Sequence, residues 1–320
     1  MRSWANVLRI LGSSIVLCAA LSAHGAPARQ GVPLYPGEIP NSIAAPDEES
    51  LRGPQDAFPF YLNISRPQLY PYPLQSAQPR PAIIILPGGS YRGVSLVKEG
   101  FDVAQQLNAY GIAAFVVKYR TPSDQHMRDK AVGPLQDAQQ AMRLVRTQAA
   151  HWNVDPKRIG LMGFSAGGHL AAMAATRDAV LPGASTAEVR PNFLMLGYPV
   201  ISFADGVTHT ISRESLLGPR PTPEQIERYS NERHVSAQTP PAFIMHAADD
   251  KGVVVANSLR FFEALQDKGV PSELIVYPAG GHGFGLNNAT TPDRWIERCR
   301  DWLLSRGYLR AEEYAGHAHH

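Results

Sequence analysis

The sequence predicts an α/β fold with a mostly parallel central sheet flanked by helices. Short, continuous apolar segments recur along the chain between turn residues, which is typical of strands that are buried on both faces. Segments with helical periodicity separate these strands, as expected where helices connect parallel strands. Because ligands of such folds bind at the carboxyl ends of the strands, we expect the functional residues in the loops that follow them.

The expected elements follow one another in a regular order. Aromatic and β-branched residues alternate with prolines in 58–72, which predicts one or two edge strands. The expected buried strands cover residues 82–86, 112–119, 159–162, 192–200, 241–247 and 273–277. The expected helices cover residues 98–110, 131–152, 257–269 and 291–304. Residues 202–238 are polar and contain prolines, so we expect a small insertion over the sheet there.

The first 25 residues are typical of a secretory signal peptide. Arg2 and Arg9 form a basic start, an apolar run follows over 10–21, and small residues come next. This run is too short to span a bilayer, so we expect a cleaved signal and a secreted or periplasmic protein rather than a membrane anchor. After signal cleavage no membrane association is expected.

The remaining chain is expected to divide into three parts. Residues 26–57 are rich in Pro, Ala, Gly and Ser, which favours an extended arm or linker. Residues 58–310 are expected to form the main α/β domain, and 311–320 a tail that contains histidines.

Composition excludes several classes of function. The chain has 320 residues, of which 44% are hydrophobic and 18% charged, as in ordinary globular proteins. Without Arg2 and Arg9 the 30 basic residues become 28, equal to the 28 acidic ones, which argues against a nucleic-acid partner. Cys299 is the only cysteine outside the signal segment, so a disulfide framework is excluded. No metal-ligand spacing stands out, and neither a metal nor another cofactor is expected.

A serine lies at the centre of the segment GFSAG (163–167), between an apolar strand and an Ala/Leu-rich helix. Strand, sharp turn and helix with a serine at the apex form the nucleophile-elbow pattern. Small residues two positions to either side let the strand and the helix approach closely. The pattern predicts Ser165 as a nucleophile raised above the edge of the sheet.

The loops after two later strands supply a candidate acid and a candidate base. Asp249 and Asp250 follow the strand at 241–247, and His282 lies in a glycine-rich loop after the strand at 273–277. A serine hydroxyl needs a neighbouring base to take its proton. A histidine can do this because it titrates near neutral pH, and an aspartate fixes the tautomer of the histidine. The order Ser, Asp, His is that of the α/β-hydrolase fold. The residues alone do not decide whether Asp249 or Asp250 is the acid.

The reaction also needs donors for an oxyanion. The amide of Ala166 lies at the start of a helix, where backbone donors are free, and a second donor is expected from the loop at 87–91. Two further histidines are expected to be structural. His169 should pack and hydrogen-bond locally one turn after Ser165, and His246 should be buried and satisfied within its strand.

Several segments together resemble the α/β-hydrolase esterases that include bacterial acetylxylan esterases and related carbohydrate acetyl esterases. These segments are PGGSY (87–91), KEG (98–100), VKYRTP (117–122), DPKRIGLMGFSAGGHLA (155–171), TPP (239–241), ADD (248–250), NS (257–258) and GGHGFGL (280–286). The resemblance covers roughly residues 60–308. The chain departs from the pattern at Val254, where relatives commonly have proline, and at Ser90, where many have a third glycine.

Carried over position by position, the resemblance implies roles for individual residues. Ser165 is the implied nucleophile, His282 the base, and Asp250 the acid, counted back from NS (257–258). The amides of Gly89 and Ala166 are the implied oxyanion donors.

The resemblance implies a secreted serine esterase that removes acetyl or other short acyl groups from a carbohydrate through an acyl-enzyme. Substrate choice is expected to depend on 202–238, including Arg213, Glu214 and Tyr229, and on Tyr91 as a substrate-binding residue. Two alternatives stay open. One is a serine peptidase of the same fold, and the other is a non-catalytic relative that binds carbohydrate.

Overall fold

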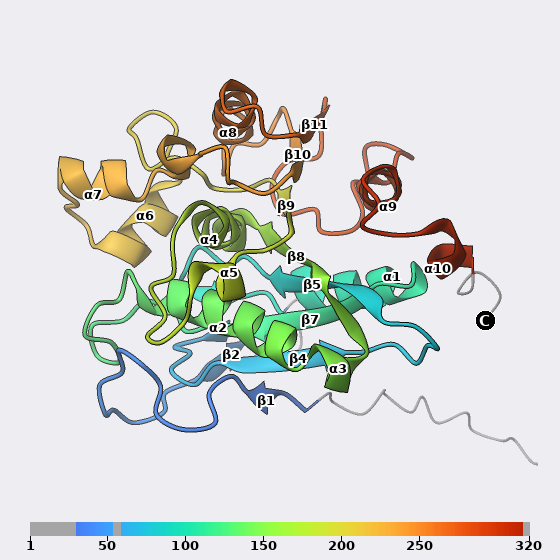
Figure 1. Cartoon of the computed structure of the whole chain (residues 1–320). Helices are drawn as coiled ribbons and strands as arrows, with labels where there is room; N and C mark the ends of the chain where they lie inside the picture. The colour runs from blue at the N-terminus through green and yellow to red at the C-terminus, as the bar shows by residue number, and fades with distance from the viewer. Residues whose placement is uncertain (1–29, 54–58, 316–320) are drawn as a thin grey trace, which may run out of the picture. The chain divides into compact units, whose positions relative to one another are not determined.

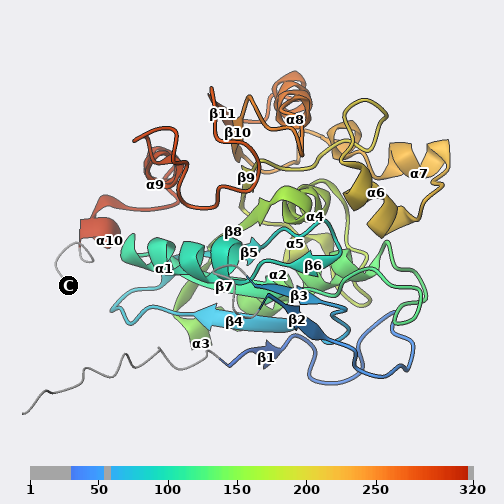
Figure 2. The same ribbon diagram turned by 180° about the vertical axis from the view of Figure 1, so that it is seen from behind.

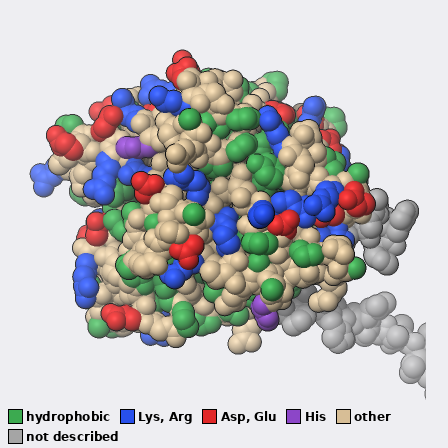
Figure 3. Space-filling view, in the orientation of Figure 1, with side chains coloured by type: hydrophobic (Ala, Val, Ile, Leu, Met, Phe, Trp, Pro, Cys, Tyr) green, Lys and Arg blue, Asp and Glu red, His purple; other side chains and the backbone are tan. Residues whose placement is uncertain are grey.

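The computed structural model describes residues 30–53 and 59–315 (Figure 1). The predicted signal peptide at 1–25 and the last part of the expected tail, 316–320, lie outside the described residues. Acidic and basic side chains are interspersed over the face shown in Figure 3, in keeping with the balanced charge of the chain.

An eight-stranded sheet forms the centre of the described chain, in the order β1-β4-β7-β5-β8-β9-β10-β11. Its strands are β1 (Val32–Pro33), β4 (Gln68–Tyr72), β5 (Arg80–Leu86), β7 (Ala113–Lys118), β8 (Val154–Phe164), β9 (Phe193–Gly197), β10 (Ala242–Ala247) and β11 (Ser272–Tyr277). From β7 to β11 all neighbouring strands in the sheet are parallel. At the other edge, β4 pairs antiparallel with both β7 and β1. The prediction of a mostly parallel sheet is confirmed.

Helices cover both faces of this sheet (Figures 1 and 2). The helices of the described chain are η1 (Val97–Phe101), α1 (Asp102–Ala109), α2 (Gly133–Thr147), α3 (Ala149–Trp152), α4 (Ser165–Thr176), α5 (Thr186–Val189), α6 (Thr210–Leu217), α7 (Pro223–Arg228), η2 (Asn231–His234), α8 (Ala256–Asp267), α9 (Trp295–Ser305) and α10 (Ala311–Ala315). Because β7, β9 and β10 are shielded on both sides, every residue of these strands is buried. The continuous apolar runs in the sequence reflect this double shielding.

The expected helices exist, with different boundaries. The segment at 98–110 is divided between a π-helical turn, η1, and α1. The segment at 131–152 is divided at Gln148 into α2 and α3, and the last long helix begins at Trp295 rather than at 291. The insertion at 202–238 contains α6, α7 and η2.

The described part of the expected arm is joined to the domain. Strand β1 pairs with β4, and β2 (Ser50–Arg52) pairs with β3 (Phe60–Leu62), which in turn pairs with β6 (Gly93–Val94). These pairings join residues far apart in the sequence, so local composition does not reveal them. The expected tail also begins as a helix, α10, whose buried Glu313 forms an ion pair with Arg158.

A fully buried ion pair connects the same arm to the core. Asp137 of α2 accepts hydrogen bonds from the side chain of Arg120, at 2.7 Å from Nη2, and from the hydroxyl of Tyr35. Both charged side chains are 0% exposed. Arg120 also donates to the carbonyl oxygen of Pro40 at 2.9 Å, so the ion pair connects the segment before β2 to helix α2.

Replacing Asp137 by alanine is therefore expected to destabilise the fold strongly, because Arg120 would stay buried without a counter-charge. We expect the free energy of unfolding to fall by about 3–5 kcal/mol, measured by urea denaturation. The matched control is Arg66→Ala, which removes an exposed ion pair with Asp47 and should cost less than about 1 kcal/mol. Equal losses in the two variants would contradict this account.

Candidate active site

The sharp turn between β8 and α4 presents Ser165. Its φ of +51° is in the left-handed region, which a residue other than glycine adopts only under strain. A Cβ added at Gly163 would lie 2.2 Å from the carbonyl oxygen of Gly167, and one added at Gly167 would lie 2.1 Å from that of Leu86. Both positions therefore need glycine: Gly163 because β8 and α4 pack with their backbones in contact, and Gly167 because α4 packs in the same way against the end of β5.

The loops after β8, β10 and β11 bring the three predicted residues together. Ser165 Oγ lies 2.8 Å from His282 Nε2. On the other side of the ring, His282 Nδ1 lies 2.7 Å from Asp250 Oδ2. The Asp250 side chain is 0% exposed and that of His282 is 29% exposed, so the ring lies between a buried carboxylate and an accessible hydroxyl. This is the geometry that general-base activation of a serine requires.

The surroundings of Asp250 keep it ionised. Its Oδ1 accepts hydrogen bonds from the amides of Gly252 and Val253, both at 2.9 Å. Burial raises the pKa of Asp250, but the hydrogen bonds from His246 and His282 lower it by more, so that the pKa lies well below its usual value. The carboxylate can thus orient the His282 ring and stabilise its protonated form.

Asp249 has a different place in the same region. Its Oδ1 accepts a hydrogen bond from the amide of Gly281 at 2.8 Å, which ties down the loop just before His282. Of the two aspartates that the sequence left open, the geometry places Asp250 against the ring. Asp249 holds the backbone that carries the ring.

The loop after β5 lies directly against the elbow. A Cβ added at Gly88 would lie 2.9 Å from the Cβ of Ser165. Gly89 has a φ of +142°, and its carbonyl oxygen accepts hydrogen bonds from the amides of Arg92 and Gly93, which close a tight turn. Gly89 and Ser165 line one cavity of about 510 Å³. With Ala166 in the first turn of α4, where amides have no intrahelical acceptor, both expected oxyanion donors flank the nucleophile.

A buried carboxylate that the sequence analysis did not identify, Glu99, joins the loop after β5 to the loop after β11. Glu99 Oε2 accepts the amide of Gly88 at 2.8 Å, and Oε1 accepts the hydroxyl of Tyr198 at 2.8 Å. The Tyr198 oxygen in turn accepts the amide of Gly285 at 3.0 Å, and its ring lies 5.1 Å from that of His282. Burial raises the pKa of Glu99. Glu99 lies in the KEG segment, but its partners are distant in sequence, so the segment alone does not reveal this link.

His169 of α4 and Tyr91 form a second buried group. His169 Nε2 donates to the carbonyl oxygen of Tyr229 at 2.8 Å, so its Nδ1 accepts from the hydroxyl of Tyr91 at 2.9 Å. Burial lowers the pKa of His169 to about 4. The prediction that His169 is structural is confirmed, as is the burial of His246, whose ring nitrogens contact Ser258 Oγ and the carbonyl oxygen of Val253.

The expectation that Tyr91 binds substrate stays a prediction. Its side chain is 1% exposed and its hydroxyl is hydrogen-bonded to His169, yet Tyr91 is also one of the residues that line a cavity of about 400 Å³. Tyr229, which was expected to influence substrate choice, is also buried. The insertion contributes other residues to the site. Ile211 lines the cavity, and the ring of His209 stacks with that of His282 at 6.5 Å between centroids.

The geometry predicts that Ser165 is an activated nucleophile, which a fluorophosphonate probe detects by covalent labelling. We expect Asp250→Asn to slow labelling on the order of a thousandfold or more, because the His282 ring loses the partner that fixes its tautomer. The matched variant Asp249→Asn should slow it far less. Labelling is followed by intact-protein mass spectrometry, and equal effects of the two substitutions would reverse the assignment.

Comparisons with known proteins agree with this architecture. The sequence profile of the BD-FAE family matches residues 69–265. An acetylxylan esterase of Xylanibacter ruminicola is 38% identical over 78% of this chain and 51% of its own length. An endo-1,4-beta-xylanase B of Butyrivibrio fibrisolvens is 34% identical over 69% of this chain and 35% of its own. The chain thus spans about half or less of these relatives.

A solved structure resembles the described domain over nearly its full extent. It is that of an acetyl ester-xyloside bifunctional hydrolase from Caldicellulosiruptor lactoaceticus, with a TM-score of 0.73 and 37% identity. The match covers 89% of this chain and 98% of that one. Sequence profile, relatives and solved structure agree, and the chain therefore belongs to the BD-FAE family of α/β-hydrolase esterases.

Proposed function

We propose that this protein is a secreted serine esterase that hydrolyses acetyl or other short acyl esters on carbohydrates. The observation that carries the proposal is the hydrogen-bonded series of Ser165, His282 and Asp250 at the carboxyl edge of the sheet. Relatives named acetylxylan esterase and xylanase support a carbohydrate as the substrate class.

In the first half of the reaction, His282 Nε2 removes the proton of Ser165 while Oγ bonds to the ester carbonyl carbon. The carbonyl oxygen becomes an oxyanion, which accepts hydrogen bonds from the amides of Gly89 and Ala166. One such donor contributes about 3–4 kcal/mol of transition-state stabilisation. The ionised Asp250 stabilises the imidazolium that forms.

The tetrahedral intermediate then collapses. His282 gives the proton to the sugar oxygen as the bond between the carbonyl carbon and that oxygen breaks, which leaves the acyl group on Ser165. In the second half, His282 takes a proton from water, the water oxygen attacks the acyl carbon, and the proton returns to Ser165 Oγ as the carboxylic acid leaves.

Secretion is the part of the proposal that rests on sequence alone. It depends on the signal-peptide pattern of residues 1–25. Within residues 30–53 and 59–315, no helix has both the length and the apolar character that a membrane span requires.

Purified protein is expected to hydrolyse p-nitrophenyl acetate and to release acetate from acetylated xylan, whereas Ser165→Ala is expected to do neither. The variant removes the attacking oxygen and changes little else, so circular dichroism should show an unaltered fold. A panel of chromogenic peptides tests the peptidase alternative. Esterase activity that survives in Ser165→Ala would refute the proposed mechanism.

A second prediction concerns Glu99 as a positioning residue. Glu99→Gln leaves one acceptor where two are needed, so either the amide of Gly88 or the hydroxyl of Tyr198 loses its partner. We expect kcat on p-nitrophenyl acetate to fall about tenfold with KM nearly unchanged, because the loop that offers the Gly89 amide shifts. Tyr198→Phe keeps the contact between Glu99 and Gly88 and should have a smaller effect. A change in KM alone would argue against this role.

A further inference from the structure

Two further cavities adjoin the one that contains Ser165. The first, of about 400 Å³, shares Arg52, Leu62 and Arg92 with it. The second, of about 580 Å³, shares Lys98 with it. The two outer cavities have no lining residue in common, so the cavity of Ser165 lies between them.

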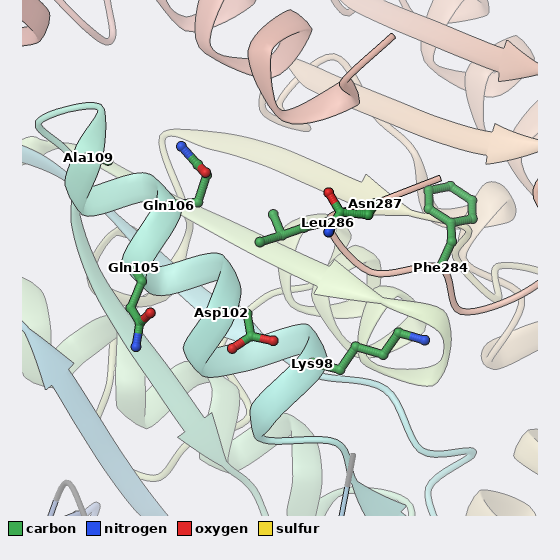
Figure 4. Close-up of a pocket in the computed structure, with 8 residues that line it drawn as sticks. All are labelled: Lys98, Asp102, Gln105, Gln106, Ala109, Phe284, Leu286 and Asn287. Atoms are coloured by element: carbon green, nitrogen blue, oxygen red, sulfur yellow. The ribbon is translucent and has the colours of Figure 1, made fainter. Parts of the chain in front are cut away.

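The cavity on the Lys98 side has both polar and apolar lining residues, and Asp102 adds a carboxylate to it. Figure 4 shows the side chains of η1 and α1 facing those of the loop after β11 across the hollow. Gln105 and Asn287 supply amides, and Phe284 supplies an aromatic surface. The cavity on the opposite side has a comparable set of neutral groups in Asn63, Ser123 and Ser215. Such linings can hydrogen-bond the hydroxyls of sugar units on either side of the acylated one.

Two arginines lie at the boundary between the cavity of Ser165 and the 400 Å³ cavity. Arg52 and Arg92 line both, and among the described residues neither takes part in an ion pair within 4.0 Å. In the described part of the chain, no acidic side chain lines the 400 Å³ cavity. Glu99 is the acidic residue lining the cavity of Ser165, and both its oxygens are already hydrogen-bonded. This boundary is therefore positively charged.

The side chain of Arg52 and the backbone of Arg92 are held in place before a ligand arrives. The guanidinium of Arg52 lies over the ring of Phe60, at 5.6 Å from its centroid. The backbone amide of Arg92 donates to the carbonyl oxygen of Gly89 at 3.0 Å, so Arg92 belongs to the same turn as the expected oxyanion donor. A group bound by Arg92 is consequently close to the ester that reacts at Ser165.

We propose that Arg52 and Arg92 form a subsite for a carboxylate on a sugar unit next to the acylated one. The substrate is then an acylated glycan that carries uronic acid units, rather than a neutral acetylated sugar. The planar guanidinium presents two parallel donors that match a carboxylate, whereas neutral hydroxyls need no such charge. This inference rests on the proposed esterase function and specifies its substrate.

The test compares two acetylated xylo-oligosaccharides of equal length, one with a glucuronic acid branch next to the acetylated xylose and one without. In the wild-type protein we expect kcat/KM to be higher for the acidic one, and this preference to shrink between 0.05 and 0.5 M NaCl as charges are screened. In Arg52→Gln/Arg92→Gln the ratio of the two kcat/KM values should fall about tenfold. Arg66→Gln, an exposed arginine outside these cavities, is the matched control and should keep the wild-type ratio.

A ratio near one in the wild-type protein, or the same ratio in the double variant, would overturn the inference. Calorimetry on Ser165→Ala protein supplies a readout that needs no hydrolysis. The acidic oligosaccharide should bind more tightly than the neutral one, and the two arginine substitutions should abolish the difference. Preferential binding of the acidic oligosaccharide without turnover would contradict the proposed esterase function but support the subsite. Turnover without preference would support the esterase function but contradict the subsite.

Discussion

Backbone contact at the elbow is the constraint on which the rest of the site depends. Gly163 lets β8 meet α4, and Gly167 lets α4 meet the end of β5, without side chains between them, and the turn holds Ser165 at a positive φ. The same absence of side chains lets Gly88 approach the Cβ of Ser165, which places the oxyanion loop beside the nucleophile. A methyl group at any of these glycines would separate elements that the chemistry needs within hydrogen-bond reach.

Two buried carboxylates at the site, Asp250 and Glu99, have pKa values shifted in opposite directions. Asp250 is surrounded by imidazole and amide donors, which lower its pKa despite burial and suit it to stabilise a cation on His282. Glu99 receives hydrogen bonds from a phenol and an amide, and burial prevails, so its pKa is raised. In the proposed reaction, one carboxylate stabilises the charge on the base, and the other connects the loops that carry the base and the expected oxyanion donor.

The surroundings of the site come from parts of the chain that lie outside the repeating strand–helix pattern. The small sheet of β2, β3 and β6 brings Arg52 to the cavity, and the insertion brings Ile211 and His209. In the α/β-hydrolase fold the central sheet supplies the reaction machinery, while peripheral segments differ among proteins and determine the substrate. The positive boundary proposed here to bind a uronic acid arises from such segments.

The sequence by itself determined the features that depend on neighbouring residues. Apolar runs predicted the strands, glycine spacing predicted the elbow at Ser165, and chain order predicted Asp and His in the loops after later strands. The residues alone left Asp249 and Asp250 open, and the resemblance implied Asp250. Tertiary structure alone decided that Asp249 holds the amide of Gly281, that the hydroxyl of Tyr91 contacts His169, and that Glu99 joins two distant loops. The physical reason is that a side chain's direction and its partners depend on packing between elements far apart in sequence, which no local pattern encodes.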